Sequence, residues 1–372
     1  MSIPNSLPRS TTPFFGRAYS LTITPLSGEY ANVPLVISSD TFEPEALRFT
    51  FDIYQYAWET CWQAEIVIYN ANGPVGSGEH PQANLYQILI QEGALVTVSA
   101  GYQADYPNGN VPAIWTGPVF YTIQDRQDVV DQRLILHCLL DRTRTVQNFI
   151  NDTLPGLSTQ FSQARFIAAQ SLNPINFNQD RFNALVTNPP PQSPSGLRMG
   201  ADNLPRAKTY FGVPHTYLYD LAKQNSLQSW FDAHEWNFDL LNQPLTDSLF
   251  ATYAPVSPQS GPPARIGGVT LSLIGQPQQT QLGLDFRVLL DPLLQVVAPI
   301  LQVAVQLQYV RQAPISYPVP ANQLPVVPLD TPNAIVAVVG VRFSGDTRGN
   351  DWYCDVTGRV PGQNLLSAIG VA

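Results

Sequence analysis

Lysine, cysteine and charge of either sign are scarce in this chain of 372 residues. Only two residues are lysine, and charged residues make up 13% of the chain, about half of the usual ~25%. The low charge excludes a coiled coil, which is rich in Glu, Lys and Arg. The 17 Phe, 16 Tyr and 6 Trp argue against a disordered chain, because they bring more apolar surface than such chains carry.

A basic stripe is also lacking. The formal net charge is -9, and residues 1–150 hold 7 Arg, no Lys and 14 Asp or Glu. A protein that binds nucleic acid by neutralising phosphates needs clustered Lys and Arg. The sequence therefore excludes that class of binder, and it concentrates the acidity in the first third. The preference for arginine over lysine suits fixed interfaces, although compositional bias accounts for it equally well.

The sequence contains little that could hold a metal, form disulfides or span a membrane. Cys61, Cys138 and Cys354 are odd in number and widely spaced, so we expect buried free thiols and folding in a reducing cytoplasm. The first residues lack the layout of a signal peptide. The most apolar stretch, 286–305, contains an arginine, an aspartate and two prolines, which excludes a ~20-residue membrane helix and predicts core strands.

Proline and glycine are abundant, at 34 and 24 residues, and they separate short segments of alternating apolar residues. This pattern is typical of an antiparallel barrel or sandwich. At least six strands are expected before residue 145. The expected strands of the first third are 19–23, 47–53, 64–69, 94–101, 113–123 and 133–139.

The rest of the chain divides into a mixed part and a second β part. A helix is predicted from Pro214 to about residue 224, followed by a strand pair near 230–231 and 236–241. Strands are predicted again at 269–274, 283–290, 301–310, 334–343 and 352–357. We therefore expect a mainly β fold with a mixed α+β insertion. The predicted domains are a β-barrel at 1–145, an accessory domain with proline-rich loops at 146–265, and a second barrel at 266–372.

The two β parts end in the same way. Each has an apolar strand, a polar connector with Asp and Arg, and a returning strand that carries Cys138 or Cys354. Sequence identity between them is slight, so an internal duplication is a hypothesis.

The segment 345–352 is the clearest local constellation. Its residue types fit a cation or sugar site, but Gly and Asn at positive φ and Asp accepting amide bonds are also what a long hairpin turn needs. Turn chemistry accounts for every residue type, so we favour a structural turn or interface. The candidate residues are Gly345, Asp346, Arg348, Gly349, Asp351 and Trp352.

Catalysis has no comparable signal. His80, His137, His215 and His234 share no local spacing typical of a metal site or catalytic triad, and a structural or surface role is the simpler interpretation. The glycine-rich segment 73–78 lacks the spacing of a phosphate loop. The aromatic residues alternate with aliphatic ones at strand spacing, which favours core packing over a carbohydrate platform. No catalytic, cofactor-binding or metal-binding residue is expected.

Several segments, in their order along residues 64–360, resemble the baseplate hub proteins of long-tailed bacteriophages. These segments are AEIVIYN at 64–70, GALVTVSAGY at 93–102, IWTGPV at 114–119, LIGQP at 273–277, LLDP at 289–292 and GDTRGNDWY at 345–353. The last is the most specific. The loops 188–196 and 314–332 match no feature of that family.

The resemblance implies two tail-tube-like antiparallel β-barrels per chain, which form a pseudo-sixfold ring as a homotrimer. Such a ring joins the sixfold tail tube or distal tail protein to the threefold central spike, and it leaves a channel for DNA without binding it specifically. The tape measure protein and other baseplate proteins are further partners that the resemblance implies. It places the protein in the virion, at the tail baseplate, after assembly in the host cytoplasm, with a structural role and no cofactor.

Two alternatives remain open. A carbohydrate-active or receptor-binding tail protein would have exposed aromatic residues around a carboxylate cleft. A distal tail or tube-initiator protein would assemble as a hexamer.

Overall fold

The computed structural model describes residues 16–26, 31–39, 47–57, 62–71, 92–106, 110–126, 132–140, 149–170, 206–224, 227–232, 236–240, 249–255, 264–266, 269–280, 283–297, 299–306, 311–312 and 333–360. In chain order its elements are β1 (Arg17–Thr24), β2 (Leu35–Ser38), β3 (Phe49–Tyr56), β4 (Gln63–Tyr69), β5 (Leu95–Tyr102), β6 (Ala113–Arg126), β7 (Gln132–Leu139), β8 (Ile150–Leu154), α3 (Gln160–Gln170), β9 (Lys208–Gly212), α5 (Pro214–Gln224), β10 (Leu227–Phe231), β11 (Trp236–Leu240), β12 (Ala251–Pro255), β13 (Ala264–Ile266), β14 (Val269–Gln279), β15 (Gly283–Leu289), β16 (Gln302–Gln306), β17 (Arg311–Gln312), β18 (Asn333–Asp346) and β19 (Trp352–Arg359).

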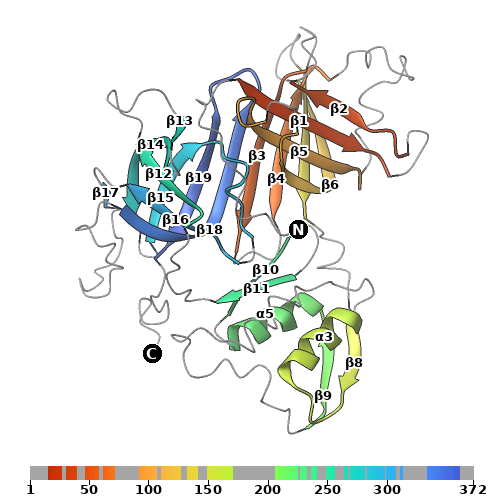
Figure 1. The fold of residues 1–372 in the computed structure, drawn as a ribbon. Coiled ribbons are helices and arrows are strands. Elements are labelled where there is room, and N and C mark those ends of the chain that lie inside the picture. Colours follow the sequence, from red (N-terminus) through yellow and green to blue (C-terminus); the bar gives the residue numbers. More distant parts are fainter. Residues whose placement is uncertain are drawn as a thin grey trace.

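In the first third, the alternation of apolar residues determines which face of each strand is buried. In β3, Phe49, Phe51 and Ile53 are buried, and the residues between them face away from the core. Successive side chains of a strand point to opposite faces, so this pattern buries one face of the sheet. β1, β2 and β5 lie across β3, β4 and β6 (Figure 1), and the two layers enclose the core between them.

The strand β6 connects these two layers. Its first residues, 113–118, pair with β5, and residues 119–126 pair with β7. The register shifts between Val119 and Tyr121, where one extra residue forms a bulge. A bulge bends the strand and increases its twist, which lets a single strand belong to both layers.

The last third forms a closed barrel of six strands, in the order β12, β14, β15, β19, β18 and β16. The pairing of β16 with both β12 and β18 closes the ring. β12 is parallel to both of its neighbours, and the other neighbouring pairs are antiparallel. Closure leaves none of these six strands at a free edge.

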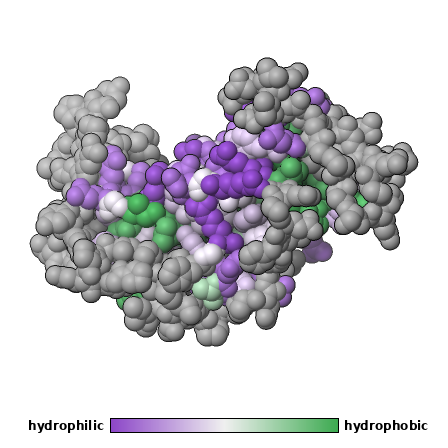
Figure 2. Space-filling view, turned by 90° about the horizontal axis from the view of Figure 1, so that it is seen from above, coloured by the Kyte–Doolittle hydropathy of each residue, from purple (hydrophilic) through white to green (hydrophobic). Residues whose placement is uncertain are grey.

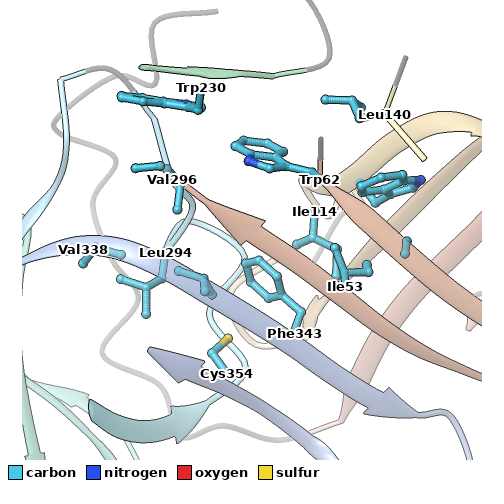
Figure 3. Close-up of a cluster of buried hydrophobic side chains, with 14 of the residues drawn as sticks. Ile53, Trp62, Ile114, Leu140, Trp230, Leu294, Val296, Val338, Phe343 and Cys354 are labelled. Atoms are coloured by element: carbon cyan, nitrogen blue, oxygen red, sulfur yellow. The ribbon is translucent and has the colours of Figure 1, made fainter. Parts of the chain in front are cut away.

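A single strand joins the barrel to the first third. Residues 333–337 of β18 pair with β16 inside the barrel, whereas residues 340–346 pair with β3. The barrel and the first third therefore belong to one continuous sheet of 15 strands. In Figure 3, Ile53 from β3 and Phe343 from β18 lie together in the core at this junction.

The hairpins β6–β7 and β18–β19 repeat the same architecture. In each, a strand of 14 residues is followed by a returning strand of 8 residues. Each long strand changes partner along its length, and each has a register shift near its middle, at 119–121 and 338–340. The returning strands carry Cys138 and Cys354, both buried and free. This likeness supports the duplication hypothesis.

The middle of the chain forms a smaller unit below the sheet (Figure 1). β8 pairs with β9, and β10 pairs with β11, in two separate antiparallel ribbons. α5 packs against β10 and α3 packs against α5. α5 buries Leu218, Leu221 and Ala222, which lie on one side of the helix at the predicted spacing.

The mainly β fold with a mixed α+β insertion is confirmed, and so is each expected strand of the first third. β12 and β13 precede residue 266, yet both pair with β14. Burial raises the pKa of the Cys138 thiol to about 12, as befits an unreactive core residue. The loops 188–196 and 314–332 and Cys61 lie outside the described residues. Within the described part of the chain, no helix is long and apolar enough to cross a membrane.

Candidate functional site

The turn 345–352 connects β18 to β19 at the end of the sheet that is uppermost in Figure 1. The Asp346 amide donates to the carbonyl oxygen of Asp351 at 2.8 Å, which closes the turn. The Thr347 amide donates to the Phe49 carbonyl at 3.1 Å, and the Phe49 amide donates back to the Thr347 hydroxyl at 3.1 Å. These bonds tie the turn to β3.

The Asp346 carboxylate is the centre of this site. Arg48 donates to both of its oxygens, at 3.1 and 2.5 Å, and the Arg348 amide donates to Oδ1 at 2.9 Å. Burial alone would raise the pKa of Asp346. The hydrogen bonds from Arg48 and from the amides of Arg348 and Gly349 outweigh burial, so that its pKa lies below the ordinary value. The ionised carboxylate is therefore the form that stabilises the fold.

Arg17 brings β1 to the same turn. Its guanidinium donates to the carbonyl oxygens of Asp346 at 2.5 Å and Gly349 at 2.6 Å. It also lies 5.2 Å from the centroid of the Trp352 ring, which is a cation–π contact. A charged donor on two carbonyl oxygens fixes the turn against the first third of the chain.

Trp352 and two glycines complete the packing. The Trp352 indole is 3% exposed and donates to the Gly101 carbonyl on β5 at 3.2 Å. A Cβ on Gly345 would lie 2.2 Å from Cζ of Phe51, and a Cβ on Gly349 would lie 2.2 Å from Oδ2 of Asp346. Only glycine allows these approaches.

Five of the six predicted residues share the hydrogen bonds that hold this turn, with Arg348 contributing its backbone amide and Asp351 its carbonyl oxygen, whereas the sixth, Gly345, contributes its close packing against Phe51. Because the carboxylate of Asp346 accepts bonds from Arg48 and from the turn itself, its arrangement suits a structural role better than a ligand site. Among the described residues, no group of three or more His, Cys, Asp or Glu is placed to hold a metal ion. Figure 2 looks onto this end of the molecule, where hydrophilic side chains gather in the middle of the face.

We expect Asp346→Asn to lower the free energy of unfolding by about 2 kcal/mol at pH 7, because it removes the charge that Arg48 and the amides stabilise. A lowered pKa in the folded state contributes stability above the unfolded pKa, about 4, and this contribution disappears as pH falls through the folded pKa. The difference between wild type and variant should therefore shrink below about pH 4. Urea unfolding from pH 7 to pH 3 measures it.

The matched control is Asp351→Asn, since the Asp351 side chain is exposed and its contribution to the turn is a backbone carbonyl. We expect it to change stability by less than about 0.5 kcal/mol. Equal losses in the two variants, or a loss for Asp346→Asn that does not vary with pH, would contradict this account.

A second arrangement, not anticipated from the sequence, is a row of charged side chains on the solvent face of the sheet. It consists of Arg287, Asp355, Arg342, Asp52 and Glu65 and ends at the imidazole of His137, and we call it the charged row. Arg287 donates to both oxygens of Asp355, at 2.6 and 3.0 Å, and Arg342 to both oxygens of Asp52, at 2.7 and 2.5 Å. The hydrogen bonds that Arg287 donates to Asp355 raise the pKa of Arg287.

The charged row crosses from the barrel into the first third. Glu65 and His137 continue it on β4 and β7, with the Glu65 Oε2 atom 3.7 Å from His137 Nδ1. Tyr121 on β6 stacks on the His137 ring at 4.4 Å. The sequence signal for this row is Arg and Asp at the outward positions of alternating strands. Only the order of the strands in the sheet shows that these residues form one row. Of the other histidines, His215 is the second residue of α5, and His80 and His234 lie outside the described residues.

Comparison with known proteins gave structural matches only. Neither a protein-family model nor a curated protein sequence matches the chain. The chain is similar to a solved tail protein from Neisseria meningitidis, with a TM-score of 0.49 and 10% identity, over 93% of this chain and 97% of that one. It is equally similar to the 43 kDa tail protein of prophage MuSo2 from Shewanella oneidensis, with a TM-score of 0.49 and 9% identity, over 95% and 100% of the two chains.

A third solved structure is a protein of Escherichia coli, described as a component of the type VI secretion system with structural similarity to bacteriophage T4 tail proteins. The TM-score is 0.41 and the identity 8%, over 87% of this chain and 78% of that one. At these identities and scores, the likeness assigns no function.

Proposed function

We propose that this protein is a structural hub of a phage tail baseplate, a homotrimeric adaptor that joins the sixfold tail tube to the threefold central spike. The observation that carries the proposal is the repeated hairpin, β6–β7 and β18–β19, with equal strand lengths and a bulge near the middle of each long strand. Two similar units in each of three chains present six similar units around an axis. A trimer of this kind matches sixfold symmetry on one side and threefold symmetry on the other.

The sequence resemblance supports the same assembly. Three of its segments coincide with β4, β5 and the start of β6, and the most specific one is the network around Asp346. The three-part division at about residues 145 and 265 belongs to this proposal, with β12 contributed to the second barrel. The mixed middle part is then an accessory domain.

The charged row is the surface that we assign to the channel. Each of its two arginine–carboxylate pairs is bidentate, so both arginines are already neutralised by protein carboxylates. A wall of paired charges gives DNA phosphates little to bind, and the excess of carboxylates in the first third repels them. DNA would pass without being held.

The partners in this proposal are two further copies of the chain, a tail tube or distal tail protein, and a central spike. Contacts with the tape measure protein and other baseplate proteins belong to the same role. The protein would act in the virion tail after assembly in the host cytoplasm, without enzymatic activity or a cofactor.

Electron cryomicroscopy of the protein with its tail partners tests the proposal. We expect a ring of three chains with six similar β units around a central channel, and we expect Arg342 and Asp52 on the channel wall. A ring of six chains would assign the protein to the tube initiator instead. The charged row on the outer wall would contradict the channel assignment.

One observation favours a second function, glycan binding by a tail protein. A groove of about 390 Å³ on the solvent face of β3, β4, β6 and β7 is lined by Tyr54, Tyr121, Glu65 and His137. Aromatic rings beside a carboxylate are the arrangement that the glycan-binding alternative predicts. Saturable binding of bacterial cell-wall oligosaccharides that Glu65→Gln abolishes would establish this function, and a monomeric state alongside it would replace the hub proposal.

A further inference from the structure

The second half of β6 forms an edge of the sheet. Residues 113–118 pair with β5, whereas residues 121–126 pair with β7 alone among the described strands. Val119 is the point where the neighbour on the β5 side ends. Its amide donates to the Ala94 carbonyl at 2.8 Å, and its own carbonyl accepts from the Gly93 amide at 2.9 Å. Beyond this point, one side of β6 has no strand beside it in the described part of the chain.

This edge has little of the protection that edge strands usually carry. Such strands are commonly very short, or they contain lysine or proline. Residues 119–124 have the sequence VFYTIQ, which contains no charge and no proline and is mostly aromatic or β-branched. The bulge lies at the start of the edge, and the register with β7 is regular from Tyr121 to Arg126. By contrast, β2 at the end of the sheet has only 4 residues. A long apolar edge of this kind favours pairing with a further strand.

An apolar row on the solvent face leads to the same edge. Val67 of β4 pairs with Ile135 of β7, and Ile135 pairs with Ile123 of β6. Ile123, at the edge, is the most exposed of the three, at 43%, and its neighbour on the same face, Tyr121, is 39% exposed. A strand added beside β6 would cover these two side chains, and cross-strand contacts of β-branched and aromatic residues stabilise a sheet.

The repeated hairpin shows what kind of element covers such an edge. β18 is the counterpart of β6, with the same length and a change of partner near its middle. Its second half, residues 340–346, pairs with β19 on one side and with β3 on the other. In Figure 1, β18 lies within the sheet beside β3, whereas β6 lies on the side of the first third that is away from the barrel. The second half of β6 is therefore the place where the repeat lacks a neighbouring strand.

We infer that a strand of a second copy of this chain pairs with residues 121–126 of β6, as β3 pairs with β18 within the chain. The occupant is a second copy because the strand that fills the corresponding position at β18 comes from the repeated unit itself. Backbone hydrogen bonds along the edge supply the affinity. Pairing through different strands on the two copies is heterologous, and such contacts close into rings. The inference rests on the proposed assembly of several copies, and it names the surface through which they join.

Hydrogen exchange tests this contact directly. In a strand with one neighbour, every second amide points away from that neighbour, and such amides exchange rapidly. We expect assembly to slow the exchange of these amides within 121–126 about tenfold or more. The measurement compares the full chain in dilute and in concentrated solution by mass spectrometry, with the assembly state given by light scattering. β3 is the internal control, because both of its sides are already paired within the chain, and its exchange should not change.

A pair of lysine variants tests the same contact by mutation. Ile123→Lys places a charge at the edge, and we expect it to raise the concentration needed for half-assembly about tenfold. Val67→Lys is the matched control, since Val67 lies in the same row on the same face, but on a strand with neighbours on both sides. It should change that concentration less than about twofold. Circular dichroism checks that each variant is folded.

The outcomes separate this inference from the hub proposal. An assembly of three chains that leaves the amides of 121–126 unprotected overturns the inference and leaves the hub in place. Equal effects of the two lysine variants on assembly also overturn it. A chain that stays monomeric overturns both. A dimer in which these amides are protected supports the pairing and contradicts the trimeric hub.

Discussion

Trp352→Ala should destabilise the protein by about 4 kcal/mol, because the indole is buried at the point where β19, β3, β1 and β5 meet. The ring packs edge-on against Phe51 at 5.6 Å and against Tyr19 at 6.3 Å. Its N–H donates to the Gly101 carbonyl, and Arg17 lies over its face. Truncation would leave a cavity, an unpaired carbonyl and a displaced arginine together. Urea unfolding followed by circular dichroism measures the loss.

The neighbouring Tyr353 provides the matched control. Its side chain points to the other face of the sheet, where the Arg287 guanidinium lies 4.0 Å from its ring centroid. We expect Tyr353→Ala to cost about 1 kcal/mol. Trp352→Phe, which keeps an aromatic ring and loses the bond to Gly101, should give an intermediate loss. If Trp352→Ala costs no more than Tyr353→Ala, the turn is not the anchor described here.

Gly283→Ala should open the barrel, with a loss of about 3 kcal/mol or more. Gly283 begins β15 and pairs with Arg359 of β19. An added Cβ would lie 2.2 Å from the Gly358 carbonyl oxygen and 2.9 Å from the Arg359 Cα. Both are backbone atoms of the adjacent strand, so the clash cannot be relieved by rotating a side chain. Denaturant unfolding measures the change in stability.

Gly275→Ala separates this steric effect from the general cost of replacing glycine. Gly275 has a φ of 71°, and no atom lies within 4 Å of an added Cβ there. Its substitution should cost only the backbone strain of a left-handed residue, about 1 kcal/mol. If Gly283→Ala loses as little stability as Gly275→Ala, the close approach of β15 and β19 at Gly283 is not needed for stability, and the prediction is contradicted.

The strands that sequence reasoning found are those whose burial alternates. β3 and β4 bury every second side chain, so the apolar pattern reports the fold directly. The expected 301–310 strand was also placed correctly at its start, since β16 covers Gln302–Gln306. α5 was predictable because its buried residues repeat at helical spacing.

The elements that were missed lack this signal. α3 has a weak apolar face, and only Thr159 marks its start, where the hydroxyl accepts from the Ser162 amide at 3.1 Å. β8 and β9 are short and polar, and they are paired across more than 50 residues of chain. Closure of the barrel by β12, with two parallel neighbours, depends on long-range pairing that no local pattern encodes.

The candidate site was predictable in its own residues but not in its partners. Glycine and aspartate at 345–351 identify a turn, since turn chemistry is local. Arg48 and Arg17, which hold this turn, are 298 and 329 residues away from Asp346 in sequence. The charged row likewise combines residues from separate strands. Contacts between residues so far apart in sequence can be identified only once the fold is known, because no local spacing of residues indicates them.

We propose that three copies of this chain form the assembly that acts in the tail. Light scattering after size exclusion, at several concentrations and with the spike partner added, measures it most directly. Three protomers of 41.0 kDa give a mass of about 123 kDa. We expect this mass for the chain alone, or for the chain in complex with the spike once the mass of the spike is subtracted. A mass that stays at 41.0 kDa with all tail partners present, or a hexamer near 246 kDa, would contradict the hub assignment.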